Sequence, residues 1–139
     1  MSNNPSSVSI LLVDDDEINN FISIKLIKKA LVSSEIKACL NGKFAIDELL
    51  KMQASGAENL PDYILLDINM PLMNGWEFLD EYKRLNIDPQ GKSKIFIISS
   101  SVFSNDINKA KSYSLVKDFI SKPLNIDKIR ELFEAEKHA

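Results

Sequence analysis

Short apolar runs alternate along the chain with longer stretches in which apolar residues recur at helical spacing. An uninterrupted apolar run of about four residues predicts a strand buried on both faces, and a short alternating pattern also predicts a strand. The predicted strands are residues 10–13, 35–40, 63–66, 95–98 and 118–120. The predicted helices are residues 17–32, 43–53, 76–85, 105–112 and 125–137.

Strands that alternate with helices predict the α/β class, in which helices cover both faces of a parallel sheet. Proline, glycine and polar residues interrupt the pattern at 54–61, 68–75 and 86–93, which predicts loops there. The first helix is expected to begin at an N-cap, Asp15 or Asp16. Its apolar stripe consists of Ile18, Phe21, Ile22, Leu26, Ile27 and Leu31.

The composition narrows the classes of function. The 139 residues fit one domain, which we expect over residues 9–139 after a flexible lead over residues 1–8. One Cys and one His argue against a disulfide framework, a Cys-rich zinc site and a His-based triad. The net charge of −3 argues against nucleic acid as a direct partner. No membrane helix or signal peptide is evident, so we expect a cytoplasmic protein with no membrane partner.

Four of the five predicted strands end in a side chain able to do chemistry. The first strand is followed by Asp14, Asp15 and Asp16, the third by Asp67, the fourth by Ser99 and the fifth by Lys122. In a parallel sheet all carboxyl ends lie along one edge, where open α/β sheets bind their ligands. The pattern therefore predicts carboxylates, a hydroxyl and an ammonium in one cleft.

Clustered carboxylates repel one another unless a cation neutralises them, and a few hard oxygen ligands suit Mg²⁺. An aspartate beside such a metal can attack a phosphoryl group and form an acyl phosphate. The metal and a lysine would offset charge on the transferring oxygens. The residue set thus favours phosphoryl transfer to an aspartate.

Four segments, in this order and spacing, resemble the receiver domain of two-component response regulators. They are residues 10–15, residues 64–67 with Asn69-Met70-Pro71 and Gly75, residues 95–100, and residues 118–124. The resemblance covers about Ser9 to Lys137 and is to the stand-alone type, similar to chemotaxis response regulators. It implies a flavodoxin-like (βα)₅ three-layer sandwich with a five-stranded parallel sheet of order 2-1-3-4-5.

The resemblance also implies a role for each residue of the cluster. Asp67 would be the phosphoacceptor. Mg²⁺, or Mn²⁺, would be bound directly by Asp15, Asp67 and the backbone carbonyl of Asn69, and through water by Asp14.

Four residues near the last two strands complete the implied site. Lys122 would contact the phosphoryl oxygens, and Ser99 would hydrogen-bond the phosphoryl group and move toward it. Phe119 matches the aromatic switch position, and Pro123 would shape the lysine loop through a cis bond. Ser99 stands where Thr is commoner, Phe119 where Tyr is frequent, and Asp118 where the family often has Gly.

The partners implied are a sensor histidine kinase or a histidine phosphotransfer protein, and a downstream protein. The downstream protein would bind the face formed by the fourth helix, fifth strand and fifth helix, and dimerisation on phosphorylation is a further expectation. Alternatively the domain only relays phosphate to another protein. In either case we expect the chain to be no enzyme beyond Mg²⁺-dependent phosphorylation and dephosphorylation of itself.

Two other functions compete with this reading. A haloacid-dehalogenase-like phosphatase would use Asp14 as nucleophile, because Asp14-x-Asp16 mimics the first motif of that family. It would also need a late acidic pair after another strand, which we do not find. A flavin carrier needs a Ser/Thr/Gly-rich phosphate loop after the first strand, and four acidic residues stand there instead.

Overall fold

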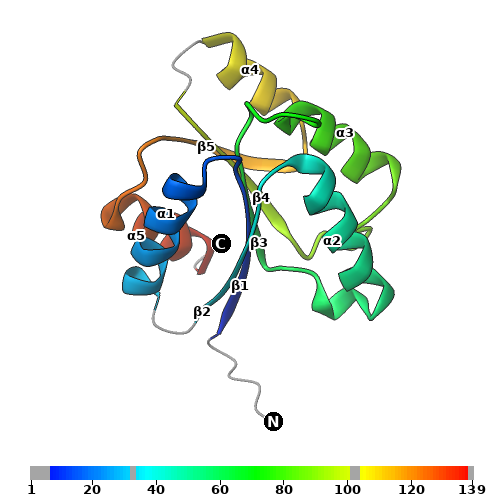
Figure 1. Ribbon diagram of the computed structural model, residues 1–139, viewed down its shortest axis with the longest axis horizontal. Helices are drawn as coiled ribbons and strands as arrows, with labels where there is room; N and C mark the ends of the chain where they lie inside the picture. Colours follow the sequence, from blue (N-terminus) through cyan, green and yellow to red (C-terminus); the bar gives the residue numbers. More distant parts are fainter. Residues whose placement is uncertain (1–6, 32–33, 101–103, 138–139) are drawn as a thin grey trace.

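The computed structural model describes residues 7–31, 34–100 and 104–137. Five parallel strands form one sheet of order β2-β1-β3-β4-β5, which confirms the predicted topology (Figure 1). The strands are β1 (Val8–Val13), β2 (Ser34–Cys39), β3 (Tyr63–Leu66), β4 (Lys94–Ser99) and β5 (Val116–Ser121).

Helices cover both faces of the sheet. They are α1 (Glu17–Ala30), α2 (Gly42–Ala54), η1 (Ala57–Asn59), α3 (Gly75–Arg84), α4 (Ser104–Ser112) and α5 (Ile126–Lys137). Figure 1 shows α1 and α5 side by side on one face and α2 and α3 on the other, with α4 packed beside β5. The strand ends that lead into α1 and α3 meet at the same edge of the sheet.

The three central strands are buried on both faces because their alternate side chains enter two different cores. Leu11 of β1, Ile64 of β3 and Ile97 of β4 pack under α2 and α3. Ile10 and Leu65 point the other way, toward α1 and α5. Continuous apolar runs are therefore what this sheet requires, and they fix the register of the strands that carry the site.

Several element boundaries differ from the sequence prediction. β1 begins at Val8, two residues before the apolar run, and the expected loop 54–61 contains the short helix η1. β5 starts at Val116, two residues before the predicted strand, and its pairing with β4 shifts between Ile95 and Phe96, which leaves Lys117 as an extra residue. Such a bulge hides the periodicity on which strand prediction rests.

Only part of the predicted apolar stripe of α1 is buried. Ile27 is fully buried, whereas the exposed fractions of Ile18, Phe21 and Ile22 are 74%, 61% and 50%. The first two turns of α1 thus present apolar side chains to the surface beside the strand ends.

None of the helices in the described residues is long and apolar enough to cross a bilayer.

Candidate functional site

Three carboxylates gather where β1 and β3 end. β1 and β3 are neighbours with Val13 opposite Leu66, so the residues that follow them meet. One oxygen from each of Asp14, Asp15 and Asp67 lies within 4.8 Å of the others. Asp14 and Asp67 are 3% and 7% exposed, whereas Asp15 faces solvent. The carboxylates predicted from the strand ends are therefore brought together.

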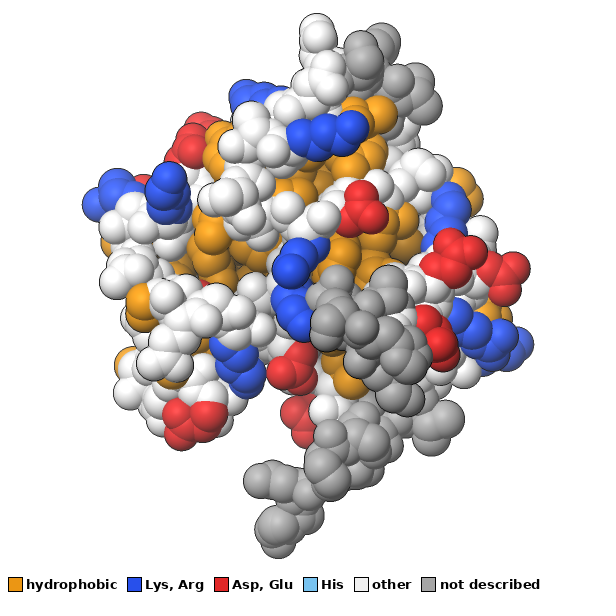
Figure 2. Space-filling model, turned by 180° about the vertical axis from the view of Figure 1, so that it is seen from behind, with side chains coloured by type: hydrophobic (Ala, Val, Ile, Leu, Met, Phe, Trp, Pro, Cys, Tyr) orange, Lys and Arg blue, Asp and Glu red, His pale blue; other side chains and the backbone are white. Residues whose placement is uncertain are grey.

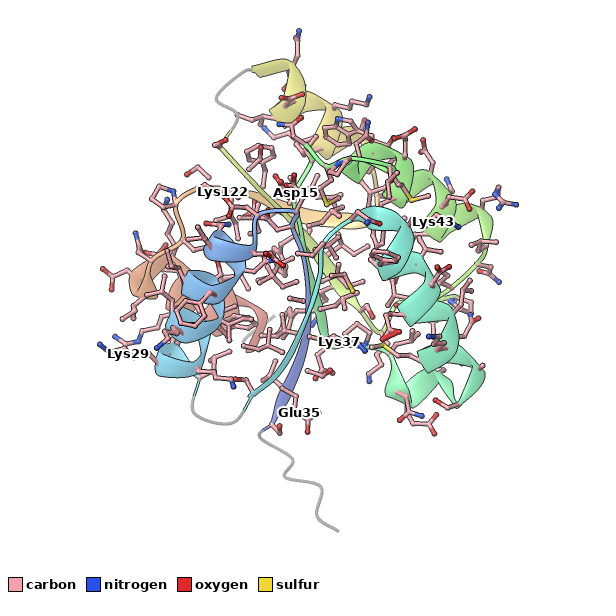
Figure 3. The ribbon with its side chains drawn as sticks, viewed as in Figure 1. Asp15, Lys29, Glu35, Lys37, Lys43 and Lys122 are labelled. Atoms are coloured by element: carbon pink, nitrogen blue, oxygen red, sulfur yellow. The ribbon has the colours of Figure 1, made fainter. Side chains whose placement is uncertain are left out.

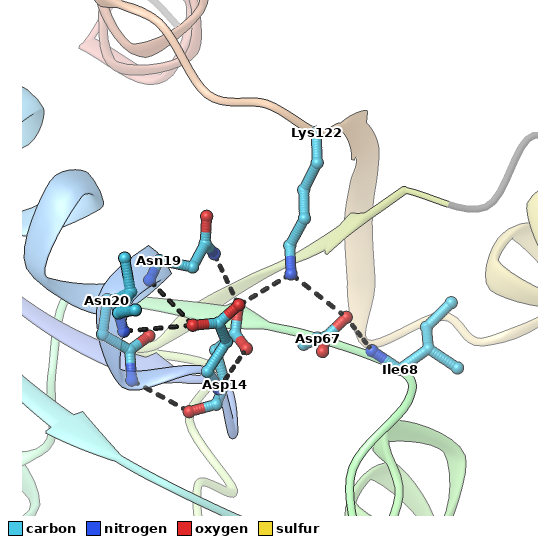
Figure 4. Close-up of polar contacts among 8 residues, drawn as sticks. Asp14, Asn19, Asn20, Asp67, Ile68 and Lys122 are labelled. Carbon is cyan, nitrogen blue, oxygen red and sulfur yellow. Dashed lines mark hydrogen bonds and ion pairs between the residues drawn. The ribbon is translucent and has the colours of Figure 1, made fainter.

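Asp14 is held by hydrogen bonds on both carboxylate oxygens (Figure 4). Its Oδ1 accepts from the backbone N–H of Asp16 at 3.0 Å, and its Oδ2 accepts from Asn19 Nδ2 at 2.8 Å. The side chain of Asn20 donates to the Asp14 backbone carbonyl at 2.9 Å. Asp16 is the N-cap of α1, one of the two residues predicted for that position. Three residues at the start of α1, Asp16, Asn19 and Asn20, thus donate hydrogen bonds to Asp14.

Lys122 reaches into this cluster from the end of β5. Its Nζ lies 2.7 Å from Asp14 Oδ2 and 3.7 Å from Asp67 Oδ1. Its backbone N–H donates to the Ser99 carbonyl at 2.9 Å, and the Lys122–Pro123 peptide bond is cis. Figure 3 shows Lys122 and Asp15 at the same end of the sheet, on segments more than 100 residues apart in sequence.

The backbone around Asp67 is tightly packed. Its N–H donates to the Val13 carbonyl at 2.9 Å, and one carboxylate oxygen accepts from the N–H of Ile68, also at 2.9 Å. The loop then returns, and the N–H of Gly75 donates to the Ile68 carbonyl at 2.8 Å. A Cβ on Gly75 would lie 2.6 Å from the Asp67 backbone oxygen, so only glycine fits there.

Burial raises the pKa of Asp67 to about 6, and the charges of Asp14 and Asp15 act in the same direction. The positive charge of Lys122 opposes the rise without cancelling it. For Lys122, burial lowers the pKa, but its hydrogen bond to Asp14 and the charges of Asp67 and Asp15 outweigh burial and raise it. The lysine is therefore cationic throughout the neutral range.

The remaining predicted residues surround the cluster at different distances. Ser99 is fully buried at the end of β4, opposite Ser121 of β5. Phe119 is half-buried, packs against the core and lines cavities on both sides of β5. Asn69 is exposed, two residues beyond Asp67 in the same loop.

Asn19 and Asn20 were missed by sequence reasoning. The signal available was a pair of adjacent asparagines inside a predicted helix, where asparagine is less favoured than at a cap or turn. Their contacts to Asp14 explain why the helix tolerates them.

The donor set fits a small divalent cation. Mg²⁺ prefers oxygen ligands, keeps several waters and is usually bound through one or two carboxylates. The Asp14, Asp15 and Asp67 oxygens meet this requirement, and the exposure of Asp15 leaves room for waters. Beside burial, the charges of Asp14 and Asp15 add to the raised pKa of Asp67, and a bound cation would offset that part of the rise.

Apolar side chains flank the same edge of the sheet. The large hydrophobic side chains exposed among the described residues all lie on segments that follow β1, β2 and β3, and we call them the apolar rim: Ile18, Phe21, Ile22, Leu40, Phe44 and Leu72. Leu72 is 81% exposed and has a φ of 67°, in the left-handed region that such a residue rarely adopts. Apolar surface concentrated at one place marks an interaction site more often than scattered exposure does.

Comparison with known proteins agrees with this geometry. A crystal structure of a two-component response regulator from Cytophaga hutchinsonii superimposes with a TM-score of 0.85 and 34% identity, over 96% of this chain and 99% of that one. Two-component response regulator 24 of Arabidopsis thaliana is 30% identical over 89% of this chain and 80% of its own length.

A third relative is longer than this chain. The protein-glutamate methylesterase/protein-glutamine glutaminase of Treponema pallidum is 35% identical over 86% of this chain, which spans only 27% of that relative's length. The sequence model of the response regulator receiver domain matches residues 10–134. With that match over most of its length and the sheet order of the fold, the chain belongs to the response regulator receiver domain family.

Proposed function

We propose that the chain is a signalling switch in which Asp67 accepts a phosphoryl group from a phosphohistidine of a histidine kinase or a histidine phosphotransfer protein. The observation that carries this proposal is the meeting of Asp14, Asp15 and Asp67 with Lys122 at one strand edge. Membership of the receiver family supports phosphorylation-dependent signalling as the general role.

In the proposed reaction, a carboxylate oxygen of Asp67 attacks phosphorus, the P–N bond to histidine breaks, and the nitrogen keeps the electron pair. Asp67 is suited to attack because one of its oxygens accepts no hydrogen bond within the described residues. Lys122 would approach the transferred oxygens, since its Nζ already lies between Asp14 and Asp67. A bound Mg²⁺, held by Asp15, Asp67, the Asn69 carbonyl and, through water, Asp14, would offset negative charge there.

Phosphorylated Asp67 would then recruit Ser99 and alter the surface around β5. Phe119, with its neighbours Lys117 and Asp118, lines both a cavity of about 250 Å³ against α4 and one of about 350 Å³ against α5. Figure 2, viewed from behind, shows hydrophobic atoms recessed in this surface with lysine and acidic side chains around them. We propose that the α4–β5–α5 face binds the downstream protein, or a second phosphorylated copy, and that Phe119 moves when Ser99 does.

The phosphatase alternative would require Asp14 as the nucleophile. Both carboxylate oxygens of Asp14 already accept hydrogen bonds, and one of them is also paired with Lys122. A carboxylate so engaged is a poorer nucleophile than Asp67, because attack must first break those bonds.

The test is intact mass after incubation with acetyl phosphate and Mg²⁺, for wild type, Asp67→Asn and Asp14→Asn. We expect one phosphoryl adduct on wild type that requires Mg²⁺ and is absent from Asp67→Asn. An adduct that survives Asp67→Asn but is lost in Asp14→Asn would instead assign the nucleophile to Asp14. Asp47→Asn, a change at an exposed aspartate of α2, serves as a carboxylate control that should leave the adduct intact.

A further inference from the structure

Asp14 accepts more hydrogen bonds than the other two carboxylates of the cluster. Its Oδ2 accepts two hydrogen bonds from different side chains, one from Asn19 Nδ2 at 2.8 Å and one from Lys122 Nζ at 2.7 Å. Asp67 accepts one hydrogen bond, on the oxygen that also faces Lys122 at 3.7 Å. The position of Lys122 between the two aspartates therefore depends on which other groups donate hydrogen bonds to the Asp14 carboxylate.

Asn19 is held firmly for this contact. Its backbone N–H donates to Oδ1 of the N-cap Asp16 at 3.0 Å, which fixes the residue in the first turn of α1. Its side-chain amide then points at Asp14 (Figure 4). The donor thus comes from a helix end whose geometry is set independently of Lys122.

Asn20 provides separate support that α1 is built to grip Asp14. Its Nδ2 donates to the Asp14 backbone carbonyl, and the residue is only 4% exposed. Its Oδ1 is buried without a hydrogen-bond partner in the described residues, a costly arrangement that an apolar residue would avoid. What Asn20 contributes in return is the contact to Asp14.

We propose that Asn19 is a positioning residue for phosphoryl transfer: by sharing Asp14 Oδ2 with Lys122, it keeps the Lys122 ammonium within reach of Asp67 and of the group transferred to it. This inference rests on the proposed function. Without the amide, Lys122 would be the only donor left to that oxygen among the described residues, so its 2.7 Å hydrogen bond to Asp14 would become stronger and harder to break. A Lys122 held more tightly by Asp14 is less free to close the 3.7 Å separation from Asp67.

A neutral amide is the group suited to this task. A carboxylate at position 19 would add a fourth negative charge near Asp14, Asp15 and Asp67 and would itself compete for Lys122. An aliphatic side chain would donate nothing. The two substitutions should therefore fail in different ways, which separates positioning from a general effect on folding.

The experiment measures the rate of phosphorylation by acetyl phosphate over a range of Mg²⁺ concentrations. For Asn19→Ala we expect the maximal rate at saturating Mg²⁺ to fall about tenfold, the effect of losing one hydrogen bond to a charged group. Asn19→Asp should also be slow, yet reach half its maximal rate at a lower Mg²⁺ concentration. Asn19→Gln, which keeps the amide on a longer side chain, should recover part of the rate.

A second readout needs no phosphoryl donor. The rise in melting temperature on adding Mg²⁺ should be larger for Asn19→Asp than for wild type, because the added charge favours the cation. Asn108→Ala, which changes an exposed asparagine of α4, is the matched control and should behave as wild type in both measurements.

The outcomes distinguish this inference from the proposed function. Wild-type protein that takes up no phosphoryl group overturns both. Wild type that is phosphorylated, with Asn19→Ala within twofold of its maximal rate, overturns only the role of Asn19. Should Asn19→Ala fail to fold, Asn19→Asp keeps the shape of the side chain and decides alone: an unchanged maximal rate contradicts the proposal.

Discussion

In the proposed function, Asp67 is a reactive carboxylate that is also buried. Burial disfavours its charged form and raises its pKa to about 6, and the charges of Asp14 and Asp15 add to this rise. Lys122 offsets part of this repulsion but is shared with Asp14. Asp67 therefore lowers the free energy of unfolding of the metal-free protein, as residues of functional sites often do.

Replacing Asp67 with Asn should stabilise the metal-free protein in a pH-dependent way. The folded protein binds a proton at Asp67 up to about pH 6, whereas the unfolded chain releases it near 3.8. Stability from this group is thus present at low pH and is lost as pH rises through about 6. Allowing for solvent screening, we expect Asp67→Asn to raise the free energy of unfolding by about 1–2 kcal/mol at neutral pH and by little at about pH 4.

Urea denaturation at several pH values in the presence of a chelator measures this difference. Asp62→Asn, at a half-buried aspartate before β3 that is remote from the cluster, is the control. A stabilisation by Asp67→Asn that grows toward low pH would contradict the assigned direction of the shift.

The helix α3 begins where its backbone closely approaches Asp67 and Ile68, the residues that follow β3. Gly75 lets the first turn approach Asp67, and the capping box between Asn74 and Glu77 fixes where the helix starts. One residue further on, Trp76 stacks on Tyr113 beyond α4, with ring centroids 5.7 Å apart, and Lys109 lies over the indole. The start of α3 thus joins the loop of Asp67 to α4.

Gly75→Ala should both destabilise the protein and impair phosphorylation. The new methyl group would meet the Asp67 backbone oxygen and Ile68 Cα at under 3 Å, and backbone atoms cannot move aside cheaply. We expect a loss of about 2–3 kcal/mol in the free energy of unfolding, measured by urea denaturation, together with slower acetyl phosphate labelling. Gly91→Ala, whose site has open space but a φ of 68°, should lower stability through the backbone alone and leave labelling unchanged.

Weakening the contact between α3 and α4 should be visible in tryptophan fluorescence, because Trp76 is the single tryptophan of the chain. Tyr113→Phe removes the hydrogen bond to Asp80 but keeps the stacked ring, and should cost about 0.5–1 kcal/mol. Tyr113→Ala also removes the stack and should shift the emission of Trp76. Emission that is identical in wild type and Tyr113→Ala would mean that the stack is not formed in solution.

Sequence reasoning predicted the strands better than the surfaces of the helices. The runs that became β1, β3 and β4 are apolar because both faces are covered, and this requirement is readable in the sequence. The exposure of Phe21 was not readable, since an amphipathic stripe does not show how far the sheet extends beneath it. The contact of Asn19 with Asp14 depends on the angle at which α1 leaves its cap, which no spacing rule supplies.

Cation binding should raise the free energy of unfolding of the whole domain. A ligand that binds only the folded state stabilises it by mass action, so Mg²⁺ at about ten times its dissociation constant should add about 1.4 kcal/mol. For a chain of this size that corresponds to a rise of about 5 °C in melting temperature. Calorimetry with and without Mg²⁺ measures it, and Asp15→Asn should abolish most of the rise while changing the metal-free melting temperature little, because Asp15 is exposed.

The apolar rim has a consequence for the lifetime of the signal. In the proposed function, an acyl phosphate on Asp67 would be lost when water reaches it. The described residues include no segment that folds over the cluster as a lid, since Asp15 is open to solvent. A donor seated on Ile18, Phe44 and Leu72 would roof the cluster itself and keep bulk water out during transfer. Hydrolysis would then begin only when the donor dissociates. The apolar contacts that hold the donor would therefore also set the moment from which the lifetime of phosphorylated Asp67 is counted.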